Sequence, residues 1–189
     1  MKRIAILLLI LLLILPTLAS AQAPFSLRNG YTWGMPLQGV KTLAQQEDLT
    51  YVGEELSDGE YSLTYSNAPV GKYEAEELYM VFTSTDDGDF GLQLCLYIFP
   101  EEELSSSKAK DVFSYLQDSL TNLYGQPSDS VREWSNAFLC WSLDNTLIEL
   151  GDLRFSSGNA TYFIRYSSNK FVDIAATESL DTIIVNEGF

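Results

Sequence analysis

Apolar residues recur at helical spacing in two stretches of the chain. The first stretch follows Pro36 and consists of Leu37, Val40, Leu43 and Ala44. The second consists of Ala109, Val112, Phe113, Leu116, Leu120, Leu123 and Tyr124. One apolar stripe of this kind is typical of an amphipathic helix. Proline suits the first turn of a helix, and glycine often follows the last. We therefore predict a helix over residues 36–47 and a second one that ends before Gly125.

Between and after these helices, apolar and polar residues alternate as they do in half-buried β-strands. The predicted strands lie near residues 49–54, 61–65, 78–83, 90–99, 130–134, 137–143, 146–150 and 160–167. Residues 67–71, with the sequence Asn-Ala-Pro-Val-Gly, are typical of a loop. Clustered strands joined by short turns favour antiparallel pairing. The predicted fold class is α+β, with an antiparallel sheet of about six to eight strands and two helices packed on one face.

Each predicted helix is followed by four predicted strands, so the two halves of the chain share an order of elements. They share no recognisable repeat of residues, so the sequence does not show whether one half is a duplicate of the other. The order of the strands in the sheet also stays open. The tail over residues 170–189 could add an edge strand or stay outside the sheet. We predict a single domain over residues 22–189.

The N-terminus has the layout of a secretory signal peptide. Two basic residues, Lys2 and Arg3, precede twelve uncharged residues over 4–15, and small residues follow Pro16. We predict cleavage after Ala21, although a second site of the same type ends at Ala23. A membrane anchor is the alternative, but a spanning helix needs about 20 apolar residues. The expected location is therefore secreted or extracytoplasmic, with no stable membrane span after cleavage.

The charge of the chain restricts its partners. The 11 basic and 26 acidic residues give a net charge of −15, and loss of Lys2 and Arg3 with the signal makes it more negative still. A surface of this sign repels phosphate backbones, so we expect no nucleic-acid partner. It would equally attract a basic protein or peptide, although acidity by itself also serves solubility.

The composition also removes common catalytic chemistries. Histidine is absent, which excludes Ser-His-Asp and Cys-His catalysis and the commonest transition-metal ligand. We expect no catalytic residues, no cofactor and no metal site. The paired carboxylates at Glu54-Glu55 and within residues 74–77 leave open a carboxylate-dependent glycan hydrolase as a less favoured function.

Two cysteines, Cys95 and Cys140, lie in predicted apolar strands. In an oxidising compartment they could form a disulfide that closes a long loop. They could equally be two buried free thiols. The sequence does not show whether their strands are neighbours.

Aromatic residues are abundant and could form an interaction surface. The candidates are Trp33, Tyr61, Tyr65, Tyr79 and Tyr97. Tyrosine and tryptophan are favoured anchors at protein interfaces. Aromatic residues are also at home in half-buried sheets, so a structural role is the alternative.

The segment Tyr31-Thr32-Trp33-Gly34-Met35-Pro36, with Val40 and Leu43 after it, resembles the start of the first helix in small exported bacterial proteins. It is distantly similar to the outer-membrane assembly lipoproteins of the BamE/SmpA type and to domains like β-lactamase-inhibitor proteins. The helix ending Leu-Thr-Asn-Leu-Tyr-Gly-Gln-Pro over residues 120–127 resembles that of other exported proteins. The resemblance implies helices against an antiparallel sheet and binding to other proteins. The chain lacks a lipobox cysteine, so no role in outer-membrane assembly is implied.

Export, the missing catalytic signatures and the aromatic strands together favour one function class. We predict a non-catalytic binding domain of the cell envelope or extracellular space that recognises a protein or peptide. The alternative is an envelope structural or stress protein without a discrete ligand site.

Overall fold

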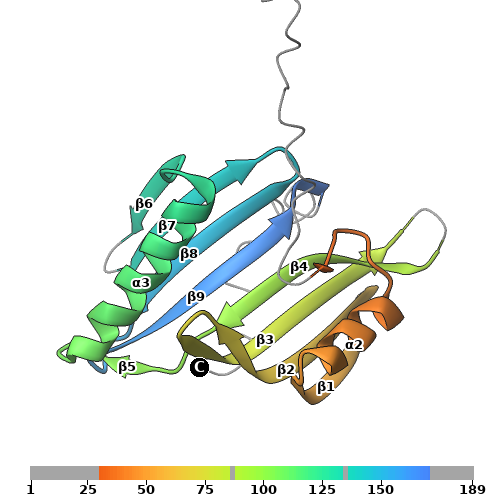
Figure 1. The fold of residues 1–189 in the computed structure, drawn as a ribbon, viewed down its shortest axis with the longest axis horizontal. Coiled ribbons are helices and arrows are strands. Elements are labelled where there is room, and N and C mark those ends of the chain that lie inside the picture. The colour runs from red at the N-terminus through yellow and green to blue at the C-terminus, as the bar shows by residue number, and fades with distance from the viewer. Residues whose placement is uncertain (1–29, 86–87, 134–135, 171–189) are drawn as a thin grey trace, which may run out of the picture.

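A computed structural model of the chain describes residues 30–85, 88–133 and 136–170. The predicted signal peptide and most of the C-terminal tail lie outside these residues. Within them the chain forms one antiparallel sheet of nine strands and two helices of at least ten residues. Figure 1 shows the two halves of the sheet side by side. The fold is α+β, as predicted, but the sheet is larger than six to eight strands.

The first half begins with helix α2, Leu37–Gln46, which starts directly after Pro36 and buries Val40 and Ala44. Four strands follow: β1 Thr50–Ser57, β2 Glu60–Val70, β3 Tyr73–Ser84 and β4 Phe90–Ile98. The helix agrees with the prediction to one residue at each end.

The predicted loop over residues 67–71 is wrong. Strand β2 continues to Val70, and the hairpin reverses only at Gly71 and Lys72. Asn67 has a φ of 58°, and the pairing of β2 with β3 is interrupted at Asn67 and the facing Glu76 without any shift in register. The turn-forming residues in this segment therefore mark a local irregularity of the strand followed by a tight turn.

The second half repeats the order of the first. Strand β5, Glu102–Glu103, precedes helix α3, Ser107–Tyr124, whose start is capped by the Ser106 hydroxyl accepting from the Ala109 amide at 3.0 Å. Strands β6 Asp129–Glu133, β7 Asn136–Leu143, β8 Thr146–Arg154 and β9 Asn159–Ser168 follow. The two-residue β5 was not predicted, because a run of three glutamates carries no strand pattern.

The order of strands joins the two halves at the centre of the sheet. It runs β1-β2-β3-β4-β9-β8-β7-β6, with β5 paired to β9 beside this path. Strands β4 and β9 are antiparallel neighbours, for example at Leu96 and Arg165. Each half is a helix followed by a four-stranded meander, and the strand order is symmetric about the β4–β9 pair.

The buried side chains of both helices belong to one hydrophobic cluster. Helix α3 contributes Ala109, Val112, Leu116 and Leu120, and the strands contribute alternate residues such as Met80, Leu150 and Ile164. Figure 1 shows α2 in front of the strands of the first half and α3 in front of those of the second. On the opposite side of the sheet Val81 and Leu94 form a second, smaller cluster with Tyr79 and Leu96.

The segment before α2 fastens the first helix to the sheet. The Gly34 amide donates to the Leu92 carbonyl at 2.9 Å, and the Leu92 amide donates to the Met35 carbonyl at 3.0 Å. A Cβ on Gly91 would lie 3.0 Å from the Gly34 Cα, so the two backbones meet where neither has a side chain. The Trp33 indole donates to the Thr146 hydroxyl at 2.7 Å and reaches the second half. The Trp-Gly-Met segment thus has a structural role.

A glycine in β8 makes room for an aromatic ring of β9. Gly151 pairs with Phe163, and a Cβ on Gly151 would lie 2.1 Å from a ring carbon of Phe163. We expect Gly151→Ala to lower the free energy of unfolding by about 1 to 3 kcal/mol, because the ring must leave its place. Urea denaturation measures this. In a Phe163→Ala background the same change should cost almost nothing, and an equal cost in both backgrounds would contradict the packing.

Candidate functional site at the edge strand β1

Strand β1 is one edge of the sheet. It pairs with β2 on one side, and within the described residues no strand pairs with its other side. Seven of its eight residues are exposed. The N–H and C=O groups on the outer side of an edge strand are free to bind another chain, so sheet edges usually carry protective features.

Three large apolar side chains lie exposed on β1. The exposed fractions are 52% for Tyr51, 59% for Val52 and 62% for Leu56. The register with β2 shifts between Tyr51 and Gly53, so Val52 is the extra residue of a bulge. Such a group of apolar side chains at a sheet edge marks an interaction surface more often than single exposed residues do.

The opposite edge of the sheet is built differently. Strand β6 has five residues, and Asp129 and Arg132 place exposed charges on it. Short edge strands with charged side chains resist pairing with other chains. The two edges therefore differ in length and in apolar character, with more exposed apolar side chains on β1.

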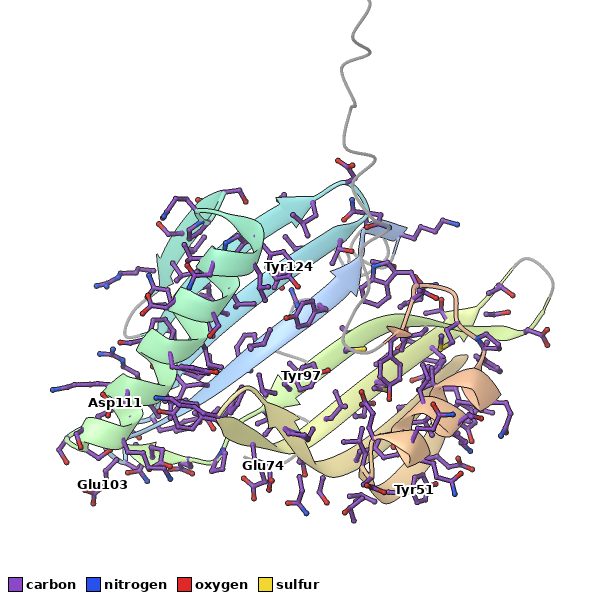
Figure 2. All side chains as sticks on the ribbon, viewed as in Figure 1. Tyr51, Glu74, Tyr97, Glu103, Asp111 and Tyr124 are labelled. Atoms are coloured by element: carbon purple, nitrogen blue, oxygen red, sulfur yellow. The ribbon has the colours of Figure 1, made fainter. Side chains whose placement is uncertain are left out.

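Aromatic rings and one ion pair organise the surface between β1 and α2. Lys41 of α2 forms an ion pair with Glu54 of β1, and its ammonium lies 6.0 Å from the centre of the Tyr61 ring. The Tyr51 and Tyr65 rings meet edge to face with centroids 5.9 Å apart. We call Lys41, Tyr51, Glu54, Tyr61 and Tyr65 the tyrosine patch. Figure 2 shows Tyr51 at the outer margin of the first half, close to α2.

The charges of the tyrosine patch are fixed near neutral pH. The hydrogen bond from Lys41, with a further one from Tyr61, lowers the pKa of Glu54 below its usual value. The same contact raises the pKa of Lys41. Partial removal from water and the nearby Glu54 raise the pKa of Tyr51. Groups whose pKa values move away from neutrality are poorly suited to exchanging protons there.

The chain around β1 is strongly acidic. Residues 47–60 contain no lysine or arginine and carry six acidic side chains, Glu47, Asp48, Glu54, Glu55, Asp58 and Glu60. Lys41 offsets one of these charges through its ion pair with Glu54. The exposed apolar residues of β1 thus lie in a field that attracts positive charge.

The structure brings together two of the five aromatic residues that the sequence suggested. Tyr61 is half-buried and Tyr65 is buried, and both belong to the tyrosine patch. Tyr97 is buried near the centre of the sheet, as Figure 2 shows. The centre of its ring lies 6.1 Å from the centre of the Tyr166 ring. Tyr79 belongs to the cluster on the opposite side of the sheet, and Trp33 packs against the main core. The five residues do not form one surface.

Sequence reasoning missed Tyr51, Val52 and Leu56. Tyr51 and Val52 lie in a predicted strand, but the alternation of residues along a strand does not show whether that strand is an edge. Leu56 lies beyond the predicted end of the strand at residue 54. A usable signal was the position of this strand as the first of a meander, since first strands often remain at an edge.

In the structure the two cysteines are free thiols. Cys95 lies in β4 and Cys140 in β7, and strands β9 and β8 separate them. Neighbouring strands lie about 4.8 Å apart, so this separation is about 14 Å. A disulfide requires Cα atoms within about 7 Å of each other.

We expect the two thiols to differ in reactivity. Complete burial raises the pKa of Cys95, and partial burial with the nearby Glu149 and Asp129 raises that of Cys140. Only the thiolate reacts with iodoacetamide, so native Cys95 should remain unmodified while Cys140 reacts slowly. Peptide mass spectrometry after timed labelling measures this, and both thiols should react fully in urea. Faster labelling of Cys95 than of Cys140 in the native state would contradict their placement.

A cavity of about 260 Å³ lies between α3 and the second half of the sheet. Its lining includes Phe113, Tyr162 and Asp152, and Arg154 donates to Asp152 Oδ2 at 2.7 Å. Asp152 Oδ1 is buried and finds no hydrogen-bond partner in the described part of the chain. Because this oxygen has no exposed surface, a molecule in the cavity could not reach it without rearrangement, and the cavity makes a weaker site than β1.

Among residues 30–85, 88–133 and 136–170, no three His, Cys, Asp or Glu side chains converge to hold a metal ion. Within the same residues, neither helix is both long and apolar enough to cross a membrane. No protein-family model, curated protein or solved structure matches the chain. The resemblance of the Trp-Gly-Met segment to BamE-like and β-lactamase-inhibitor-like proteins therefore stays a prediction.

Proposed function

We propose that this chain is an exported, non-catalytic domain of the cell envelope or extracellular space that recognises a protein or peptide. Its binding surface is the tyrosine patch with the exposed residues Val52 and Leu56 of β1. The buried residues of both helices belong to the main core, and within the described residues no strand covers the outer side of β1. The observation that carries the proposal is the exposure of Tyr51, Val52 and Leu56 together on an edge strand.

The tyrosine patch has the composition of a protein-binding surface. Interfaces are enriched in tyrosine and combine a central apolar area with a polar rim. Here the Tyr65 ring supports the Tyr51 ring from the core, and the Lys41–Glu54 ion pair holds the surface between β1 and α2 in place. A surface that is already ordered loses less conformational entropy when a partner binds.

The alternative hydrolase gains no support from the carboxylates on β1. Glu54 pairs with Leu63 and Glu55 with Ser62, so the two side chains point to opposite faces of the sheet. Glu54 is also held in the ion pair with Lys41. Two carboxylates that flank one glycosidic bond must face each other across a cleft.

The proposal can be tested with the predicted mature chain, residues 22–189, immobilised and exposed to the producing cell's envelope and medium. Mass spectrometry identifies the captured proteins. The test variant carries Tyr51→Ser and Leu56→Ser, and the control carries Val131→Ser on the opposite edge strand β6. Circular dichroism checks that each variant folds.

We expect one dominant partner that the unchanged chain and the Val131→Ser control retain and the test variant loses. A partner retained by all three would place binding elsewhere on the molecule. If nothing is captured above background at low salt, the recognition function is wrong, and an envelope structural or stress role becomes the better interpretation.

A further inference from the structure

The turn between β1 and β2 determines which backbone groups of β1 point outward. Asp58 and Gly59 have φ values of 49° and 85°, as in a two-residue type I′ hairpin, and Ser57 pairs with Glu60 on either side of them. In such a turn the two flanking residues form a hydrogen-bonded pair. Hydrogen-bonded and non-hydrogen-bonded pairs alternate along an antiparallel ladder.

This alternation assigns the outer edge of β1. Ser57 and Glu55 direct their N–H and C=O groups toward β2. Leu56 and Glu54, which face Tyr61 and Leu63 in the register, direct theirs away from the sheet. Within the described residues no strand lies beyond β1, so an added chain can reach these groups.

We propose that the partner's binding segment adds to the sheet as a further strand along β1, and that it is an extended segment in which basic and apolar side chains alternate. This inference rests on the proposed function and specifies its mode. Strand addition gains affinity from main-chain hydrogen bonds and specificity from alternate side chains. The eight residues of β1 offer enough length for several such bonds.

The side chains of β1 define the chemistry of the added strand. Residues directly opposite each other on neighbouring strands interact, and opposite charges there are favourable. Apolar side chains of the partner would pack against Leu56 and Tyr51. Basic ones would face Glu55 and the acidic stretch over residues 47–60, where Lys41 already offsets Glu54.

A second copy of the chain fits this edge poorly. Antiparallel pairing of β1 with the β1 of another copy would bring the glutamates at residues 54 and 55 of both copies together. Like charges on adjacent strands are destabilising, and each molecule carries a net charge of −15. The occupant is therefore a different protein with positive charge.

The test uses synthetic peptides, because the natural partner is unidentified. The probe is acetyl-Lys-Val-Lys-Val-Lys-Val-amide with a fluorescent label, titrated with residues 22–189 and followed by anisotropy. Two further peptides have the same side chains, one N-methylated at the lysines and the other at the valines. Only alternate residues of an added strand bond to β1, so we expect one N-methylated peptide to bind at least tenfold more weakly and the other to bind like the parent.

Amide hydrogen exchange measured by NMR locates the bound peptide. At saturating peptide we expect exchange at the Glu54 and Leu56 amides to slow at least tenfold, and exchange at Glu55 and Ser57 to change little. A Glu55→Lys variant should weaken binding at least threefold more than Glu74→Lys, which makes the same charge change on an exposed residue of β3.

Three outcomes would overturn the inference. Equal binding of both N-methylated peptides, or unchanged exchange at Glu54 and Leu56, would exclude strand addition. Protection of these amides in a dimer without peptide would identify a second copy as the occupant. Failure of the lysine–valine peptide to bind at millimolar concentration would exclude the basic strand. If the capture experiment still yields a partner that the Tyr51→Ser/Leu56→Ser variant loses, the proposed function stands and only its mode is wrong.

Discussion

Replacing Trp141 with alanine is expected to lower the free energy of unfolding by about 3 to 5 kcal/mol. Trp141 is the largest of the fully buried side chains, with 1% of its surface exposed, and its removal would leave a cavity in the main core. Its indole N–H donates to the Gly125 carbonyl at 2.9 Å. The last carbonyls of a helix lack partners within the helix, so this bond links β7 to the end of α3.

The loss would be large beside the whole stability of a domain of this size, which is about 5 to 15 kcal/mol. Urea denaturation followed by far-ultraviolet circular dichroism is the appropriate measurement, because the substitution removes a fluorophore. Trp141→Phe keeps most of the packing and should lose less. Leu123→Ala, on α3 with 71% of the side chain exposed, is the control and should change the stability by less than about 0.5 kcal/mol. A similar small change for Trp141→Ala would contradict its place in the core.

The helices could be predicted well because their signals are local. The stripe that begins at Ala109 repeats over several turns, and Gly125 with a φ of 84° ends α3 where the sequence indicated. Helix α2 likewise follows Pro36 directly. Hydrogen bonds within a helix join residues four positions apart. All the residues that interact to form a helix therefore lie within one short segment of the sequence.

The extent and order of the strands were harder to predict because their partners are distant in sequence. Strand β5 exists because Glu102 pairs with Ala160, and β4 meets β9 across the two halves. Neither pairing leaves a mark in the local alternation of residues. The separation of Cys95 from Cys140 follows from the same strand order, so the sequence left their pairing open.

The candidate site depends on this order as well. Alternation showed that Tyr61, Tyr65 and Tyr97 lie in strands, but it could not show that Tyr65 and Tyr97 face the core. Central strands of this sheet carry apolar residues on both faces. The sequence pattern of such a strand therefore does not show which side chains face the main core. Exposure of Tyr51 and Leu56 results from the place of β1 at the edge, a property of the whole sheet that no short segment encodes.

Buried tyrosines predict a cooperative loss of the fold at alkaline pH. Burial is the main cause that raises the pKa of five of them above the usual value, namely Tyr31, Tyr65, Tyr124, Tyr162 and Tyr166. In the unfolded chain a tyrosine loses its proton near pH 10. Above that pH the folded protein retains protons that the unfolded chain has lost, so stability is fully present below pH 10 and falls as the pH rises. Each such group lowers the stability only between pH 10 and its own raised pKa, where the folded and unfolded chains differ in bound protons.

An alkaline titration that follows tyrosinate absorbance and far-ultraviolet circular dichroism together measures this loss. We expect only part of the eleven tyrosines to ionise while the secondary structure persists, and the remainder to ionise in the same narrow range in which it is lost. Tyr65→Phe removes one buried hydroxyl and should move the unfolding midpoint to higher pH, whereas Tyr79→Phe, on the opposite side of the sheet, should move it less. Ionisation of all eleven tyrosines near pH 10 with the circular dichroism unchanged would mean that the rings between the helices and the sheet are open to water. The main core would then be packed differently from this structure, and the strand order that places β1 at the edge would be in doubt as well.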